Sequence, residues 1–151
     1  PFDLTYVDFK DMLSKRKTKI KPLLMDQSFI SGIGNIYASE ILFRARIDPR
    51  RVTASTTENE KQACAHAIQH GLPRALKQAL SKEIKDVLSS AIKHGGSSVD
   101  DYVRLSGKPG DYRRFHRVYG RGGKPCFICR GPIKKITQGG RGTYFCGKCQ
   151  K

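Results

Sequence analysis

The chain has 151 residues, 38% of them hydrophobic, which is enough for one domain or two small ones. It is strongly basic, with 29 Lys and Arg against 13 Asp and Glu and a formal net charge of +16. This balance favours a polyanionic partner, with nucleic acid ahead of an anionic membrane surface. No apolar run approaches the roughly 18 residues of a membrane-spanning helix, so we expect no membrane-embedded segment in this sequence.

The first predicted element is a short amphipathic helix that follows a linker at residues 1–4. Thr5 and Asp8 stand at the spacing of a capping box, which is typical of a helix start. The apolar positions of this helix recur at helical spacing: Phe2, Tyr6, Phe9 and Leu13. A basic run at residues 15–21 comes next. Such a run is usually a solvated face, but here it leads into a glycine turn, which favours phosphate contact through Lys17 and Lys21.

Two helical pieces flanking a tight glycine turn are predicted within residues 21–45. The turn, at residues 31–35, contains Gly32 and Gly34, and Asn35 stands where the N-cap of the second helix is expected. A glycine turn that leads into a helix N-terminus exposes unpaired backbone N–H groups, which suit a phosphate. An ordinary helix–turn–helix of the core remains the alternative, because glycine turns are common.

Residues 45–119 are predicted to be mainly helical. Asp48 and Pro49 end the second helix of the glycine-turn unit, and further helices are expected at residues 57–70 and 98–105. Between them a long helix begins at Pro73 and ends at residues 93–96. Its predicted buried stripe consists of Leu76, Leu80, Ile84, Val87, Leu88, Ala91 and Ile92. Residues 106–111 are expected to form a flexible loop, and residues 113–119 an extended basic and aromatic stretch.

Four cysteines near the end of the chain predict a structural zinc site. They form two Cys-x-x-Cys pairs: Cys126 and Cys129, then Cys146 and Cys149. Two such pairs build a closed tetrahedral thiolate site, and an intracellular zinc site explains them better than disulfides. A second site made of Cys64, His66 and His70 is rejected, because no further ligand set exists.

The sequence between the two cysteine pairs predicts a β-hairpin. Residues 133–138 and 143–145 are expected to pair as strands, with residues 139–142 as the tip. Arg141 stands among glycines at that tip, and its planar guanidinium suits a phosphate. A solvated turn arginine is the alternative. Because the core here is small, zinc would supply much of the free energy that folds the hairpin.

Two stretches, residues 17–51 and 118–151, resemble the C-terminal half of the formamidopyrimidine-DNA glycosylase family, whose relatives include endonuclease VIII. The resemblance also includes residues 92–110 and covers nearly the whole chain. It implies a base-excision-repair enzyme, a DNA glycosylase and lyase, that excises oxidised purines such as 8-oxoguanine and formamidopyrimidines. Such an enzyme flips the lesion out of the base stack and then nicks the abasic site by β,δ-elimination.

The resemblance also implies roles for particular residues. The family's glycine-turn unit and zinc-hairpin arginine grip the phosphates around the flipped nucleotide. The matching DNA-binding positions here are Lys17, Lys21, Gly34, Asn35 and Arg141. The arginine that corresponds to Arg141 also has a role in δ-elimination. Residues 104–112 resemble the loop that covers the lesion in the family.

The start of the chain departs from the family pattern. Family chemistry begins from an N-terminal Pro-Glu pair, whereas Phe2 follows Pro1 here. We therefore interpret residues 1–4 as the family's interdomain linker, and we expect the catalytic N-terminal β-sandwich to be absent. A minimal lyase that uses the Pro1 amine is the alternative, but no carboxylate stands beside Pro1.

The sequence thus predicts a mainly α fold with a small zinc β-hairpin. We expect a helix-two-turns-helix domain at residues 1–117 and a four-cysteine zinc finger at residues 118–151, with one structural zinc. The expected partner is double-stranded DNA with an oxidised base or abasic site, bound by a monomer in the bacterial cytoplasm, with no membrane contact. The alternative functions are a non-enzymatic zinc-ribbon module that binds nucleic acid and a zinc ribbon associated with the ribosome or a polymerase.

Overall fold

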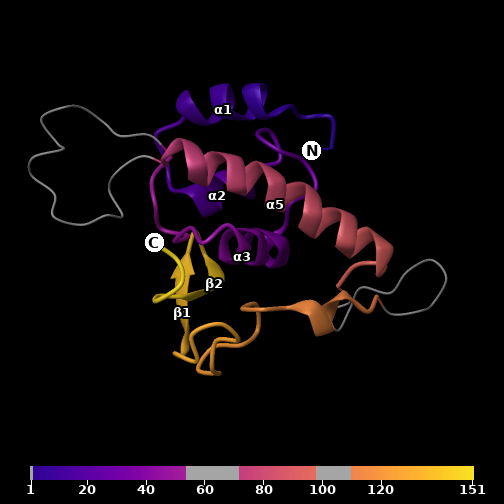
Figure 1. Cartoon of the computed structure of the whole chain (residues 1–151), viewed down its shortest axis with the longest axis vertical. Helices are drawn as coiled ribbons and strands as arrows, with labels where there is room; N and C mark the ends of the chain where they lie inside the picture. The colour runs from indigo at the N-terminus through magenta and orange to yellow at the C-terminus, as the bar shows by residue number, and fades with distance from the viewer. Residues whose placement is uncertain (1, 54–71, 98–109) are drawn as a thin grey trace, which may run out of the picture.

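The computed structural model describes residues 2–53, 72–97 and 110–151. Within these ranges the chain forms helices and one antiparallel hairpin (Figure 1). Their bounds are α1 (Tyr6–Ser14), α2 (Ile20–Leu24), α3 (Asn35–Arg44), α5 (Arg74–Lys93), the 3₁₀ helix η1 (Tyr112–Phe115), β1 (Ile133–Gln138) and β2 (Arg141–Cys146). The helices predicted at residues 57–70 and 98–105 lie outside the described residues, as do Cys64, His66 and His70.

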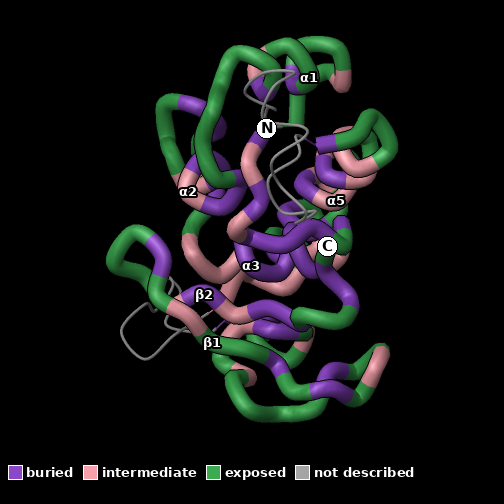
Figure 2. Tube along the Cα trace, turned by 90° about the vertical axis from the view of Figure 1, so that its left-hand side faces the viewer, coloured by how far each residue is buried: buried purple, intermediate pink, exposed green. Residues whose placement is uncertain are grey.

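The helices pack around one hydrophobic core. The long helix α5 crosses α1 and α3, and α2 packs on α3 (Figure 1). Thr5 caps α1 by accepting a hydrogen bond from the Asp8 backbone N–H, as the capping-box spacing predicts. The faces turned toward this core are buried, while the outer turns are exposed (Figure 2). The largest fully buried apolar side chains of the core are Phe9, Leu13, Ile20, Leu24, Ile33, Ile41, Leu42, Ile47, Leu80 and Tyr112.

The hairpin lies against the opposite side of α3 and has a second, smaller core. Strand β2 contacts α3, and Phe43 of α3 packs among Val118, Ile133 and three of the cysteines. The strands are joined by Gly139 and Gly140, both with positive φ (56° and 71°), as a two-residue hairpin turn requires. Helix α3 is therefore shared by both cores.

Several sequence predictions of element boundaries are wrong by a few residues. Helix α3 ends at Arg44, before Asp48 and Pro49, and Pro73 is the N-cap of α5 rather than its first residue. Arg141 opens strand β2 and pairs with Gln138, so the turn is shorter than predicted.

Two further differences concern burial and local conformation. Ile92 is 68% exposed, because it lies about 100° around the helix axis from Ala91, which is buried in the core. Part of the stretch predicted as extended forms η1, whose buried Tyr112 contacts the rings of Tyr37 in α3 and of His94, the C-cap of α5. Among the described helices, none combines the length and the apolar character needed to cross a membrane.

Candidate nucleic-acid interface and metal centre

The connection between α2 and α3 consists of two turns that side chains hold in place. Asp26 accepts hydrogen bonds from the Ser28 hydroxyl (2.7 Å) and backbone N–H (2.9 Å), and these bonds hold the pKa of the Asp26 carboxyl below its usual value. Gln27 bridges the second turn, since its amide donates to the Ile33 carbonyl and its oxygen accepts from the Gly32 N–H at 2.9 Å. Gly32 has a φ of +87°, which favours glycine. The turn therefore presents the N-terminus of α3 in a fixed direction.

The N-cap of α3 is Gly34, so the prediction that Asn35 caps the helix is wrong by one residue. Gly34 is extended (φ −96°, ψ −177°), it is exposed, and no side chain caps the helix. The first N–H groups of α3 have no partner within the helix, as at any helix N-terminus. The exposed N-terminus has the polarity that suits an anion.

Asn35 uses its side chain to accept a hydrogen bond from the buried ammonium of Lys21. The distance from Lys21 Nζ to Asn35 Oδ1 is 2.5 Å, and Nζ also donates to the Thr143 hydroxyl of β2 at 2.9 Å. Burial lowers the pKa of Lys21 to about 8, and the positive charge of Arg141 lowers it as well. Lys21 thus joins α2, the start of α3 and the hairpin, with its side chain beneath the surface rather than on it.

The other predicted DNA-binding residues lie at the surface. Arg141 is exposed at the start of β2, and its carbonyl accepts a hydrogen bond from the Thr143 hydroxyl at 3.4 Å. Lys17 is exposed in the segment between α1 and α2. In the described part of the chain, its side chain forms no ion pair or hydrogen bond with Lys21, Asn35 or Arg141. The structure therefore brings Lys21, Asn35 and Arg141 together beside Gly34 and leaves Lys17 as a separate positive charge.

The four cysteines converge at the other end of the hairpin. Their Sγ atoms all lie within 4.8 Å of one another, with Cys126 and Cys149 at 3.9 Å and Cys129 and Cys146 at 3.4 Å. Zinc–sulfur bonds of about 2.3 Å in a tetrahedron place sulfurs about 3.8 Å apart, so these residues fit one zinc ion. The Ile128 N–H points at Cys126 Sγ (3.4 Å), which would stabilise a thiolate. The zinc would hold the two knuckles together and fix the base of the hairpin.

A buried carboxylate joins α3 to the segment that enters the zinc site. Glu40 accepts hydrogen bonds from three consecutive backbone N–H groups, those of Arg117 (2.8 Å), Val118 (3.0 Å) and Tyr119 (2.9 Å). Burial raises the pKa of Glu40, while these donors and the Arg44 charge act in the opposite direction. The three bonds fix where the chain leaves the helices and starts toward Cys126.

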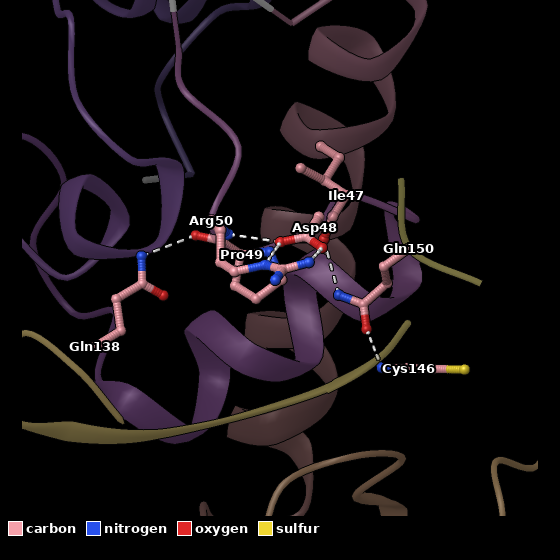
Figure 3. A network of polar contacts seen from close by, with 7 residues as sticks. All are labelled: Ile47, Asp48, Pro49, Arg50, Gln138, Cys146 and Gln150. Carbon is pink, nitrogen blue, oxygen red and sulfur yellow. Dashed lines mark hydrogen bonds and ion pairs between the residues drawn. The ribbon is translucent and has the colours of Figure 1, made fainter. Parts of the chain in front are cut away.

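A polar network attaches the hairpin to the loop after α3 (Figure 3). Gln138 donates to the Pro49 carbonyl at 3.1 Å, and Gln150 bridges the Ile47 carbonyl and the Cys146 N–H, both at 2.8 Å. Backbone bonds run from Asp48 N to Lys151 O and from Lys151 N to Arg46 O, both 3.1 Å. The hairpin is thus held beside its turn by Gln138, at its base by Cys146, and through the residues that follow β2, so the position of Arg141 relative to Asn35 is set.

Sequence reasoning missed Gln27, Glu40, Thr143 and Gln150. Glu40 had a visible signal, because it is an acid beside the apolar stripe of α3, next to Ile41. Thr143 and Gln150 each contact one residue more than a hundred positions away, Lys21 and Ile47, and no local pattern reveals these contacts.

Family models match both parts of the chain. The formamidopyrimidine-DNA glycosylase H2TH domain model matches residues 2–82. The zinc finger found in FPG and IleRS matches residues 123–151, which include all four cysteines.

Similar proteins extend the match to almost the whole chain. The formamidopyrimidine-DNA glycosylase of Heliobacterium modesticaldum is 43% identical over 99% of this chain and 48% of its own length, and that of Solibacter usitatus is 42% identical over 100% and 51%. The crystal structure of the MutM (Fpg) protein from Thermus thermophilus has a TM-score of 0.81 and 35% identity, covering 97% of this chain and 50% of that one.

A Lactococcus lactis Fpg in complex with DNA containing an abasic site has a TM-score of 0.78 and 33% identity, covering 99% of this chain and 48% of that one. The chain thus spans about half the length of the relatives it matches. With its two glycine-turn helices, its zinc hairpin and these matches, the chain belongs to the formamidopyrimidine-DNA glycosylase family.

Proposed function

We propose that this chain is the DNA-binding part of a base-excision-repair glycosylase and lyase that removes oxidised purines and nicks the resulting abasic site. The observation that carries the proposal is the hydrogen-bonded junction of Lys21, Asn35 and Thr143, which sets the N-terminus of α3 beside the Arg141 end of the hairpin. Phosphates on one strand could then meet a helix N-terminus and a guanidinium together. Lactococcus lactis Fpg structures with DNA that contains an abasic site or Fapy-dG support the same partner.

In this proposal the role of each residue depends on its position at the surface or beneath it. The backbone at Gly34, the Asn35 amide and the Arg141 guanidinium contact phosphates, and Lys17 adds a further contact at the edge. Lys21 supplies charge from below and orients the Asn35 side chain. We also propose that Arg141 assists δ-elimination, because a guanidinium bound to the leaving phosphate stabilises its negative charge.

The proposal also divides the chain into two units that bind the same DNA. We propose a helix-two-turns-helix domain at residues 1–117 and a zinc finger at residues 118–151. We also propose that the protein acts as a monomer in the cytoplasm of a bacterium, since copies with a net charge of +16 repel each other and the similar proteins are bacterial. This chain alone binds damaged duplex DNA and performs little or no base excision, because the family's Pro-Glu pair is not in its sequence.

The test is a binding titration combined with borohydride trapping on a duplex that contains one abasic site. We expect tighter binding than to the undamaged duplex of the same sequence and no covalent adduct. Equal, weak binding to both duplexes would contradict the damaged-DNA assignment and favour a general nucleic-acid module. An adduct that maps to Pro1 would contradict the proposal that this chain performs little or no catalysis.

A further inference from the structure

A cleft of about 460 Å³ lies where the C-terminal end of α3 meets the first zinc knuckle, residues 126–129. Apolar side chains form part of its wall: Phe43 from α3 and the two residues between the knuckle cysteines, Phe127 and Ile128. Phe127 is 49% exposed and Ile128 54% exposed. Neither side chain is needed to bind zinc, and both are costly to leave in water, so this knuckle has apolar surface available for a partner.

The rest of the cleft wall is positively charged. Arg44, Arg46 and Arg117 line it together with Glu83 of α5. The buried Glu40 accepts a hydrogen bond from the Arg117 backbone N–H and also lies near enough to Arg44 for the Arg44 charge to lower its pKa. In the described ranges, none of these three arginines forms an ion pair with a carboxylate. Arg121 is not part of the cleft wall, but its guanidinium lies 3.6 Å from the centre of the Phe127 ring, and that of Arg117 lies 5.3 Å from the same centre. Guanidiniums beside exposed apolar side chains are typical of surfaces that recognise acidic and apolar groups together.

This cleft is separate from the proposed DNA-binding surface. The hairpin strands have six residues each, with Arg141 at one end of β2 and the zinc ligand Cys146 at the other. At about 3.4 Å per residue the two ends lie roughly 17 Å apart. The ten-residue α3 likewise separates Asn35 from Arg44 by about 14 Å along its axis. The knuckle cleft is therefore displaced by about 14–17 Å from the residues that would hold a duplex.

We propose that this cleft binds an acidic segment of another protein, with an apolar side chain seated against Phe127 and Ile128 and carboxylates paired with Arg44, Arg46 and Arg117. A second copy of this chain is disfavoured as the occupant, because its net charge is +16. Nucleic acid is disfavoured because a phosphate backbone offers no apolar group to Phe127 and Ile128. The site is an addition to the proposed DNA-binding function and lies outside it.

The experiment uses the zinc-loaded chain and a short fluorescein-labelled peptide of aspartates and glutamates around one Leu-Phe pair, followed by fluorescence anisotropy. Saturable binding is expected, and it should weaken about tenfold for the variant Phe127→Ala/Ile128→Ser and for a peptide with alanines in place of the Leu-Phe pair. Arg117→Gln should weaken binding several-fold. Arg113→Gln removes the same charge from an exposed position outside the cleft and should have no effect.

Competition with an unlabelled duplex separates this site from the DNA-binding surface. We expect the peptide to remain bound at duplex concentrations that saturate the protein, and Arg141→Ala to leave peptide affinity unchanged. Full displacement by the duplex, or equal binding by the Phe127→Ala/Ile128→Ser variant, would show a general polyanion effect and overturn the proposal. Loss of duplex affinity in that variant, with zinc content unchanged, would instead assign the cleft to nucleic acid.

Discussion

The ammonium of Lys21 lies 2.9 Å from the hydroxyl of Thr143, although 122 residues separate them in the sequence. The same ammonium contacts Asn35 at 2.5 Å, so one buried cation spans the start of α3 and the hairpin. Because both acceptors are neutral, the charge is not cancelled where it is buried. This explains why burial lowers the pKa of Lys21 to about 8.

The first prediction concerns the pH dependence that follows from this lowered pKa. An unfolded lysine titrates near 10.5, so between about pH 8 and 10.5 the unfolded chain binds more protons than the folded one. The contribution of Lys21 to the free energy of unfolding should therefore rise with pH through that window, whereas its help in DNA binding should fall. Denaturant unfolding and duplex titrations across the window measure both effects.

The control for this prediction is Lys21→Met, which keeps the length of the side chain and removes the titrating group. The difference between wild type and variant isolates Lys21 from the tyrosines and zinc thiolates. Identical pH profiles for the two proteins would mean that Lys21 does not titrate in this range.

The second prediction concerns the hydrogen bonds of Glu40. Glu40→Ala leaves the N–H groups of Arg117, Val118 and Tyr119 without their acceptor, and should lower the free energy of unfolding by about 3 kcal/mol. Limited trypsin digestion should cleave after Arg117 and Arg121 faster than in wild type. Glu83→Ala removes a less buried acid from α5 and should change stability by no more than about 0.5 kcal/mol. Equal effects of the two substitutions would contradict the role given to Glu40.

The third prediction concerns the exposed arginine at the start of β2. Arg141→Ala should weaken duplex binding regardless of sequence and reduce the slope of log K against log salt by about 0.9, the value for one phosphate contact. Lys148→Ala removes an exposed charge at the zinc end of the hairpin and should leave the slope unchanged. An unaltered slope for Arg141→Ala, measured by filter binding, would remove Arg141 from the interface.

The fourth prediction concerns the zinc ion. A strong chelator should remove one zinc per chain, unfold the hairpin and weaken duplex binding, because the metal supplies much of the folding free energy of so small a unit. Circular dichroism should retain most of the helical signal, since the main core lies among the helices. Unchanged proteolysis of residues 120–151 after metal removal would contradict a structural zinc.

The fifth prediction concerns the two-residue turn that precedes Arg141. Both turn glycines have positive φ, which a β-branched residue adopts only with strain. Gly140→Val should therefore lower the free energy of unfolding by about 1–2 kcal/mol and weaken duplex binding by displacing Arg141. Gly139→Asn is the matched control, because asparagine suits the first position of this turn. Thermal unfolding and the duplex titration measure both variants, and equal melting temperatures would contradict the turn assignment.

The sequence predicted the parts of the fold that depend on local chemistry. Spacing and residue type predict the two helices around the glycine turn, the Thr5 cap, the end of α5 and the cysteine cluster. Each of these features is present. Family resemblance supplied the expected partner and lesion class, which spacing alone could not.

The errors arise where a tertiary contact competes with a local rule. Asn35 is a good N-cap residue, but its side chain accepts from Lys21, and Gly34 takes the cap position instead. Residues 113–119 are predicted to be extended, but residues 113–115 continue from the buried Tyr112 in a 3₁₀ turn. The contacts of Thr143 and Gln150 depend on how the hairpin docks, and this is fixed only once α3 and the zinc site are both in place.

The shared helix α3 has one more consequence, which concerns how this sequence can change. Its first residue meets Lys21, while Glu40 and Phe43 hold the zinc unit. Adding one residue between Tyr37 and Glu40 would turn one end by about 100° relative to the other and lengthen the helix by about 1.5 Å. The N-terminus of α3 and the zinc unit would then face different directions, even if every contact residue were retained. Descendants of this sequence can therefore substitute residues in α3 but cannot change its length.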